Sequence, residues 1–145
     1  MSRSVAEMLD VIKARTRVEN SGVNDALEEL LEDYLSLCPT DDPRFTRDAV
    51  LRDWREHFAQ KGQLMHYHSP GCGRCENTGF RGRAGLHELM TISRDLRRLI
   101  QTGARAEELQ ACALREGMRT LRQDGIEKVL QGITGIEEVR ATSNM

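Results

Sequence analysis

The stretch from Gly71 to Arg83 reads GCGRCENTGFRGR and is the most specific pattern in the chain. Cys72 and Cys75 are separated by two residues, so one tight turn can aim both sulfurs at a single point, as a tetrahedral Zn²⁺ requires. The stretch also holds four glycines, which allow positive φ angles and let amide N–H groups approach the thiolates closely. One C-x2-C pair supplies only two of four ligands, so the others must come from elsewhere.

Cys38 is the first candidate for a further ligand, because it lies 34 residues before Cys72, just past the end of a predicted helix. Many structural zinc sites are assembled from two such knuckles. Where a second thiol would stand in this knuckle the sequence has Asp41, whose carboxylate is a harder and less favoured zinc ligand. His66 and His68 are rival fourth ligands, since either imidazole can approach from a predicted strand. The predicted metal ligands are Cys38, Asp41, Cys72 and Cys75, and the alternative is a loop held without metal by glycine turns and packing.

Composition indicates a helical, highly solvated protein that forms one compact domain or a small domain with an arm. Of the 145 residues, 30% are charged, 39% are hydrophobic and only 4% are aromatic. No apolar run approaches the roughly 18 residues of a membrane span, and the N-terminus lacks the apolar core of a signal peptide, so we expect a soluble cytoplasmic protein. The net charge of −2 argues against nucleic acid as a partner.

Three helices are predicted in the first part of the chain. The capping box Ser4-x-x-Glu7 starts the first, and apolar residues follow it at helical spacing. The second carries a strong apolar stripe, with acidic residues up to Asp33 on its outer face. The third has two candidate caps, Asp42-Pro43 and Thr46, and closes at a glycine. The predicted ranges are about 4–16, 23–35 and, from either cap, to Gly62.

Two strands are predicted around the cysteine stretch. Residues 64–68 alternate in polarity and lead directly into it, and residues 84–92 have strand character after it. Four helices follow, because Ser93 can cap the first and glycines end the first three. They end at Gly103, near Gly117, at Gly132 and, by fraying, over Ser143-Asn144-Met145. The predicted fold class is α+β, mostly helical, with a short strand-and-knuckle zinc-binding-like subdomain and a C-terminal helical subdomain.

A few other reactive or charged residues have more than one interpretation. Cys112 lies among apolar residues of a predicted helix, where a buried, inert thiol is more common than a reactive one. Arg81 and Arg83 flank a glycine and can form planar ion pairs, reach a neighbouring subunit or make simple surface salt bridges. The lone histidines His57 and His87 fit surface or packing roles better than catalysis.

The sequence has no recognisable catalytic motif. It lacks a G-x-x-x-x-G-K-[ST] phosphate loop and a G-x-G-x-x-G turn in strand–helix context. It also lacks a G-x-S-x-G elbow, an H-E-x-x-H helix and a credible nucleophile–base pair. We therefore expect no ATP hydrolysis by this chain alone, and predict a module that acts by contact with other protein surfaces.

The cysteine stretch and the short motifs after it resemble the C-terminal region of the type II secretion and type IV pilus assembly ATPases (GspE/PilB type). The resemblance covers residues 71–140 in order and with little gap. Residues 1–38 are less similar, and look like the family segment that leads from the nucleotide-binding core into its first metal knuckle. The motifs that carry the resemblance are GCGRCENTGFRGRAGLHEL, then Glu116-Gly117-Met118-x-Thr120-Leu121 with Asp124-Gly125, then Gly132-Ile133-Thr134 and Glu137-Glu138-Val139.

The resemblance implies three parts of a larger motor. These are a helical segment resembling the end of the ATPase core (1–37), a metal-binding-like insertion (38–83) and a C-terminal helical subdomain (84–145). Family members bind zinc with two C-x2-C pairs, so three cysteines match ligand positions here and Asp41 departs from the fourth.

The resemblance also implies a role and partners. Family members are hexameric cytoplasmic motors at the inner membrane that drive protein transport or pilus assembly, and ATP and magnesium are bound only by the parent motor. The implied function of this chain is a non-catalytic C-terminal region of such an ATPase. Its implied partners are the ATPase core, neighbouring subunits and inner-membrane platform proteins, with no nucleic acid and no direct membrane insertion.

Two other hypotheses differ in class. The chain can be a free-standing, zinc-stapled interaction module or a truncated paralogue outside any motor, which requires Met1 to be the native start. It can also be a nucleic-acid or chaperone-type zinc module, because its C-x2-C with trailing Asn and Gly is similar to the cysteine-rich repeats of the DnaJ chaperones. The ATPase-tail hypothesis instead requires a phosphate loop upstream in the natural chain.

Overall fold

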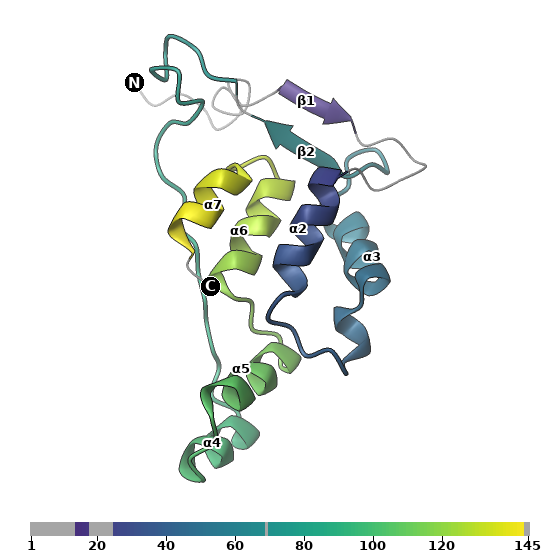
Figure 1. The fold of residues 1–145 in the computed structure, drawn as a ribbon, viewed down its shortest axis with the longest axis vertical. Coiled ribbons are helices and arrows are strands. Elements are labelled where there is room, and N and C mark those ends of the chain that lie inside the picture. Colours follow the sequence, from purple (N-terminus) through teal and green to yellow (C-terminus); the bar gives the residue numbers. More distant parts are fainter. Residues whose placement is uncertain (1–13, 18–24, 69, 144–145) are drawn as a thin grey trace.

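The computed structural model describes residues 14–17, 25–68 and 70–143, and these form a mostly helical structure with one small sheet (Figure 1). The mostly helical class predicted from the sequence is confirmed. None of the described helices is both long enough and apolar enough to cross a membrane. In chain order the elements are β1 (Ala14–Arg17), α2 (Asp25–Leu35), the 3-10 helix η1 (Pro43–Phe45), α3 (Arg47–Phe58), β2 (Met65–His68), α4 (Arg94–Gln101), α5 (Ala106–Arg115), α6 (Leu121–Leu130) and α7 (Ile136–Thr142).

The sheet is an antiparallel pair in which Ala14 of β1 lies opposite His68 of β2. β2 confirms the strand predicted just before the cysteine stretch. The prediction of a helix that runs to about Thr16 is wrong at its end, because residues 14–16 pair with β2. Pairing with a neighbouring strand outweighs a local helical pattern, since local propensity is only a weak preference. The rest of that predicted helix, residues 4–13, lies outside the described residues.

Both candidate caps before α3 are used. The carboxylate of Asp42 accepts a hydrogen bond from the backbone N–H of Arg44 (3.0 Å) and caps η1. The hydroxyl of Thr46 accepts one from the backbone N–H of Ala49 (3.3 Å) and caps α3. Each cap satisfies a backbone donor that a helix start leaves unpaired. The third predicted helix is therefore split into a short 3-10 turn and an α-helix.

The main core lies where α2 packs between α6 and α3, with α7 against α6 (Figure 1). Trp54 of α3 is completely buried, and its ring meets that of Tyr34 of α2 edge-on, with centroids 5.2 Å apart. Gly125 of α6 permits the close approach of α7, because a Cβ at this position would lie 2.4 Å from Cγ1 of Val139. The core side chains come from all three predicted parts of the chain: Leu27, Leu30, Leu31, Tyr34, Val50, Leu51, Trp54, Leu64, Ile126, Val129, Leu130 and Val139.

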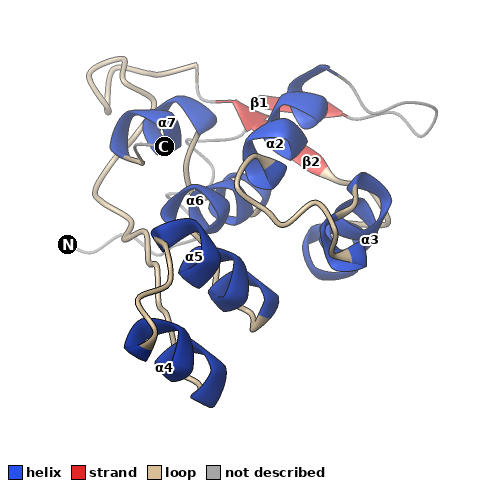
Figure 2. Cartoon of the chain, turned by 60° about the horizontal axis from the view of Figure 1, so that its bottom comes forward, coloured by secondary structure: helices blue, strands red, loops and turns tan. Residues whose placement is uncertain are grey.

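A helical hairpin of α4 and α5 has a smaller core of its own at one end of the molecule (Figures 1 and 2). The hydroxyl of Ser93 caps α4 as predicted, accepting a hydrogen bond from the backbone N–H of Leu96 (3.0 Å). Phe45 of η1 packs against the hairpin core, which joins the hairpin to the segment between α2 and α3. The glycines that follow α4, α5 and α6 have positive φ angles, which confirms the predicted helix stops.

Residues 84–92, here called the linker segment, join the cysteine stretch to α4 and form no strand. The strand predicted there is therefore wrong as a paired element. The reason is that strand character needs a neighbouring strand to receive the backbone hydrogen bonds, and the described sheet contains only β1 and β2. The linker segment stays largely exposed, and the side chain of Leu89 is 77% exposed.

The end of α7 is anchored. Ser143 is 1% exposed, and Arg122 of α6 donates hydrogen bonds to its hydroxyl (2.8 Å) and its carbonyl oxygen (2.7 Å). The predicted fraying is thus wrong at Ser143, because a guanidinium from another helix holds the chain there. Asn144 and Met145 lie outside the described residues.

A pair of Leu→Ala variants tests the assignment of the core. Leu30→Ala removes a side chain that is 1% exposed in the main core, so we expect a loss of about 2–5 kcal/mol in the free energy of unfolding. Leu89→Ala is the matched control, since the same atoms are removed from an exposed site, and we expect a change within about 0.5 kcal/mol. Denaturant unfolding followed by Trp54 fluorescence measures both. Equal losses in the two variants would contradict this core.

Candidate metal site and cysteine loop

Residues 71–83, here called the cysteine loop, close on themselves through a short hydrogen-bonded turn. The backbone N–H groups of Cys75 and Asn77 both donate to the carbonyl oxygen of Cys72, at 3.2 and 2.9 Å. Gly71 has φ +81°, and a Cβ there would lie 2.6 Å from the carbonyl oxygen of Asn77, so only glycine fits. This turn places the sulfurs of Cys72 and Cys75 at 3.6 Å from each other.

Backbone amides surround the sulfur of Cys75. The N–H groups of Cys72 and Gly79 both donate to it at 3.1 Å. Burial acts to raise the pKa of the Cys75 thiol, but these hydrogen bonds outweigh burial and hold the pKa below its ordinary value. Of the four glycines in the loop, Gly79 has the role that the sequence predicts, since its amide donates to a cysteine sulfur.

The two thiols fit two positions of a tetrahedral zinc site. With Zn–S bonds of about 2.3 Å, tetrahedral geometry puts two sulfurs about 3.8 Å apart. The observed 3.6 Å is close to that separation. Among the described residues, however, no group of three or more His, Cys, Asp or Glu side chains could hold a metal ion.

Cys38 is engaged elsewhere. It follows the C-terminal end of α2, whereas the strand that leads into the cysteine loop lies near the N-terminal end of that helix (Figure 1). Its buried sulfur donates to the carbonyl oxygen of Tyr34 (3.4 Å) and accepts from the side-chain amide of Gln123 in α6 (3.0 Å). Burial raises the pKa of the Cys38 thiol, which favours the neutral form over a metal-binding thiolate.

Asp41 is also engaged elsewhere. Its exposed carboxylate forms an ion pair with Arg115 of α5, with 2.7 Å between Nη2 and Oδ1. The structure therefore brings together Cys72 and Cys75, and does not bring Cys38 or Asp41 to them. His66 and His68 lie on β2 directly before the loop, and their side chains are outside the described part of the chain. The choice among Asp41, His66 and His68 as fourth ligand stays a prediction.

Cys112 differs from the buried thiol predicted for it, because it is partly exposed on α5. Its sulfur lies 3.7 Å from a carboxylate oxygen of Glu116. Burial first and the negative charge of Glu116 second raise the pKa of the Cys112 thiol. Both effects favour the neutral, less reactive thiol. The predicted burial is therefore incomplete, and the inertness of Cys112 stays a prediction.

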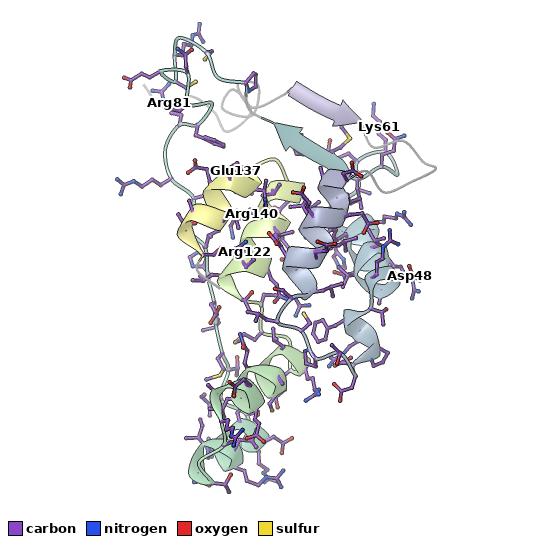
Figure 3. All side chains as sticks on the ribbon, in the orientation of Figure 1. Asp48, Lys61, Arg81, Arg122, Glu137 and Arg140 are labelled. Atoms are coloured by element: carbon purple, nitrogen blue, oxygen red, sulfur yellow. The ribbon has the colours of Figure 1, made fainter. Side chains whose placement is uncertain are left out.

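Arg81 and Arg83 are exposed on the cysteine loop, and Figure 3 labels Arg81 on that loop. Neither guanidinium forms an ion pair with any side chain that the structure describes. Of the predicted interpretations, an ion pair within the described chain is thus not formed, and contact with another subunit is left as a proposal.

An ion-pair group that no sequence pattern indicates lies between α2, α6 and α7. Arg122 and Arg140 both reach a carboxylate oxygen of Asp33, at 3.1 and 2.9 Å. Figure 3 labels these two arginines on α6 and α7. Asp33 is therefore not simply on the outer face of its helix, as the charge pattern predicts. Arg122 lies 89 residues from Asp33 in the chain, and no local pattern reports a pair of that separation.

The site and the fold together define the class of protein. It is a mostly helical protein with a loop that holds two neighbouring thiols, and its sequence contains no phosphate loop. Comparison with known proteins identifies the family. Residues 10–141 match the family model described as Type II/IV secretion system protein, and the chain belongs to that family. The resemblance to secretion and pilus assembly ATPases is thereby confirmed.

Individual relatives are moderately similar. The chain is 48% identical over 75 residues to the type IV pilus assembly ATPase PilB of Thermus thermophilus, which covers 52% of this chain and 8% of that protein. It is 36% identical over 106 residues to the type II secretion system ATPase E of Vibrio cholerae, covering 72% and 20%. It is 37% identical over 107 residues to the type IV pilus assembly ATPase TfpB of Acinetobacter baylyi, covering 71% and 18%. The chain thus spans a fifth or less of these relatives' lengths.

Zinc content of cysteine variants tests the ligand set. We expect Cys72→Ser to reduce bound zinc to background, because it breaks the only sulfur pair seen among the described residues. We expect Cys38→Ser and Asp41→Asn to leave zinc unchanged, because those side chains bind Gln123 and Arg115 instead. The measurement is zinc per chain by elemental analysis after purification without chelator.

The other results of that experiment are equally informative. Loss of zinc in Cys38→Ser, to the level of Cys72→Ser, would support the four-ligand set that the resemblance implies. Loss in His66→Ala or His68→Ala would assign the fourth ligand to β2. Background zinc in the unmodified chain would overturn the prediction of a zinc site.

Proposed function

We propose that this chain is the non-catalytic C-terminal region of a secretion or pilus assembly ATPase, and that it works by contact with other parts of the motor. The observation that carries the proposal is the family match over residues 10–141 in a sequence that has no phosphate-binding loop. A region of the motor that lacks this loop contributes no ATP site by itself. ATP and magnesium would belong to the rest of the parent protein.

The linker segment supports a contact role. The carboxylate of Glu88 accepts a hydrogen bond from the first backbone N–H of α6, at Leu121, and the backbone N–H of His87 donates to Asp124, both at 2.9 Å. These bonds hold one side of the segment on α6. The segment exposes three large apolar side chains, Leu89, Met90 and Ile92, at 77%, 39% and 45%.

Such an apolar group is best explained by a protein contact. Single exposed apolar residues are common on surfaces, but clusters of them more often mark interaction sites. In the proposed motor the contact would be with the ATPase core of the same subunit or with a neighbouring subunit of a hexamer. Association with the inner membrane would be indirect, through platform proteins of the secretion or pilus system.

The alternative function is a free-standing interaction module, zinc-stapled or not, that is not part of a motor. The observation that favours this alternative is a main core built from this chain alone. Trp54, Ile126 and Val129 are completely buried in it without a second chain. A fold with its own core can exist as a separate product. The two functions differ in the size of the natural protein.

The size of the native product separates the two functions. An antibody raised against this chain would be used on a lysate of the source cells, with a strain deleted for the gene as control. The proposal predicts a band several times heavier than 16.4 kDa, because related ATPases match this chain over a fifth or less of their length. A band at 16.4 kDa would overturn the proposal and favour the separate module.

A charge placed in the linker segment tests the contact itself. In the natural full-length protein we expect Leu89→Asp to lower secretion or pilus assembly at least tenfold, because a carboxylate is costly to bury at an apolar contact. Ile100→Asp is the matched control, since Ile100 is 49% exposed on α4, outside the linker segment. Thermal unfolding of this chain with each substitution checks that the fold is retained. Full assembly activity in Leu89→Asp would contradict a contact at this segment.

A further inference from the structure

The four cysteines of the chain have very different surroundings. All four are free thiols. Cys38 is buried between α2 and α6, where the amide of Gln123 donates to its sulfur. Cys112 lies on α5 beside the carboxylate of Glu116. Cys72 and Cys75 are different again, because they lie close together in the cysteine loop. Their sulfurs are 3.6 Å apart.

The turn of the cysteine loop has the span that a disulfide needs. A hydrogen bond from Cys75 N to Cys72 O (3.2 Å) closes a four-residue turn, and such turns keep the first and last Cα atoms within about 7 Å. Disulfide-bonded cysteines have Cα atoms about 4.4–6.8 Å apart and sulfurs about 2.05 Å apart. The sulfurs must therefore approach by about 1.5 Å, which side-chain rotation can supply.

Access to the two thiols is unequal. Cys72 is partly exposed, and the space beside Gly73 is open, because a Cβ there would meet no atom within 4 Å. Cys75 is 8% exposed, and the backbone amide of Gly79 donates a hydrogen bond to its sulfur. A small reagent thus reaches Cys72 first, while Cys75 stays within reach of the sulfur of Cys72.

We propose that Cys72 and Cys75 form a reversible disulfide by exchange with a low-molecular-weight disulfide of the glutathione type. The Cys72 thiolate attacks one sulfur of the reagent, breaks its S–S bond and releases one reduced thiol. Cys75 then attacks the Cys72 sulfur of the mixed disulfide, and the second reagent thiol leaves. The net step oxidises two protein thiols to one disulfide and reduces one reagent disulfide to two thiols, with the two protons going to the released thiolates.

This dithiol chemistry is independent of the proposed motor function. It uses the same two sulfurs that would hold zinc, so a loop that carries zinc is protected and a loop without zinc is open to oxidation. The site would therefore exist in one of three states: metal-bound, reduced or disulfide-closed. Neither Cys38 nor Cys112 takes part, because one is enclosed in the core and the other has no thiol beside it among the described residues.

The test is oxidation of the purified, chelator-treated chain with oxidised glutathione, followed by thiol counting. We expect four reactive thiols in the denatured reduced protein and two after oxidation, with full recovery on reduction. Arg74 lies between the two cysteines, so trypsin cleavage after Arg74 separates them into different peptides. After alkylation of the free thiols, mass spectrometry should find these two peptides joined by a disulfide until a reductant is added.

Variants and metal provide the controls. Cys112→Ser should form the same disulfide, whereas Cys75→Ser should stop at a glutathione adduct on Cys72. Prior loading with zinc should slow oxidation at least tenfold if the loop binds the metal, and equal rates would mean that it does not. The unmodified chain suffices for the peptide map, so the test does not depend on any variant folding.

Three results would overturn the proposal. The first is four reactive thiols after oxidation. The second is a stable glutathione adduct on Cys72 in the unmodified chain, because Cys75 would then fail to displace it. The third is a disulfide that includes Cys38 or Cys112, because the pairing would then not follow the geometry of the cysteine loop.

Discussion

The contact between α2 and α6 is the constraint on which the rest of the structure depends. Leu30 of α2 and Ile126 of α6 are both buried in the main core, together with apolar residues of α3 and α7. The side chain of Gln123 fixes the end of this contact, because its amide donates both to Tyr34 O and to the sulfur of Cys38, at 3.0 Å each. A buried amide with all its partners in place specifies one packing arrangement, since any other would leave polar groups unpaired.

That constraint separates the core thiol of Cys38 from the loop pair of Cys72 and Cys75. The side-chain amide of Gln123 donates to the sulfur of Cys38 in the interface between α2 and α6. Cys72 and Cys75 lie instead in a loop that follows β2 and is closed by its own backbone hydrogen bonds. The loop needs no distant residue to hold its two sulfurs together. The proposed disulfide would therefore be local to the loop, whereas a zinc ion would need further ligands from outside this pair. The fold of the helices is supported by apolar burial.

The features that can be predicted from the sequence are those whose signal is local. The helix stops after α4, α5 and α6 were predictable, because glycine at positive φ is a property of a single position. The cysteine pair was predictable because one tight turn can bring together two cysteines that are three positions apart. β1, the unpaired linker segment and the Arg122–Asp33 ion pair were not, because each depends on what lies alongside in space, 89 residues away in the last case. Cys38 has a thiol-ligand spacing in sequence, but its partner in space is Gln123.

Unfolding of the chain with and without a zinc chelator shows whether apolar packing or a metal supports the helices, and the fluorescence of its single tryptophan, Trp54, follows it. Trp54 is completely buried in the main core and reports that core alone. We expect the same denaturant midpoint in both conditions, because apolar packing and not a bound metal supports the helices. Loss of the folded Trp54 signal on chelation, as in domains that fold only around zinc, would contradict it.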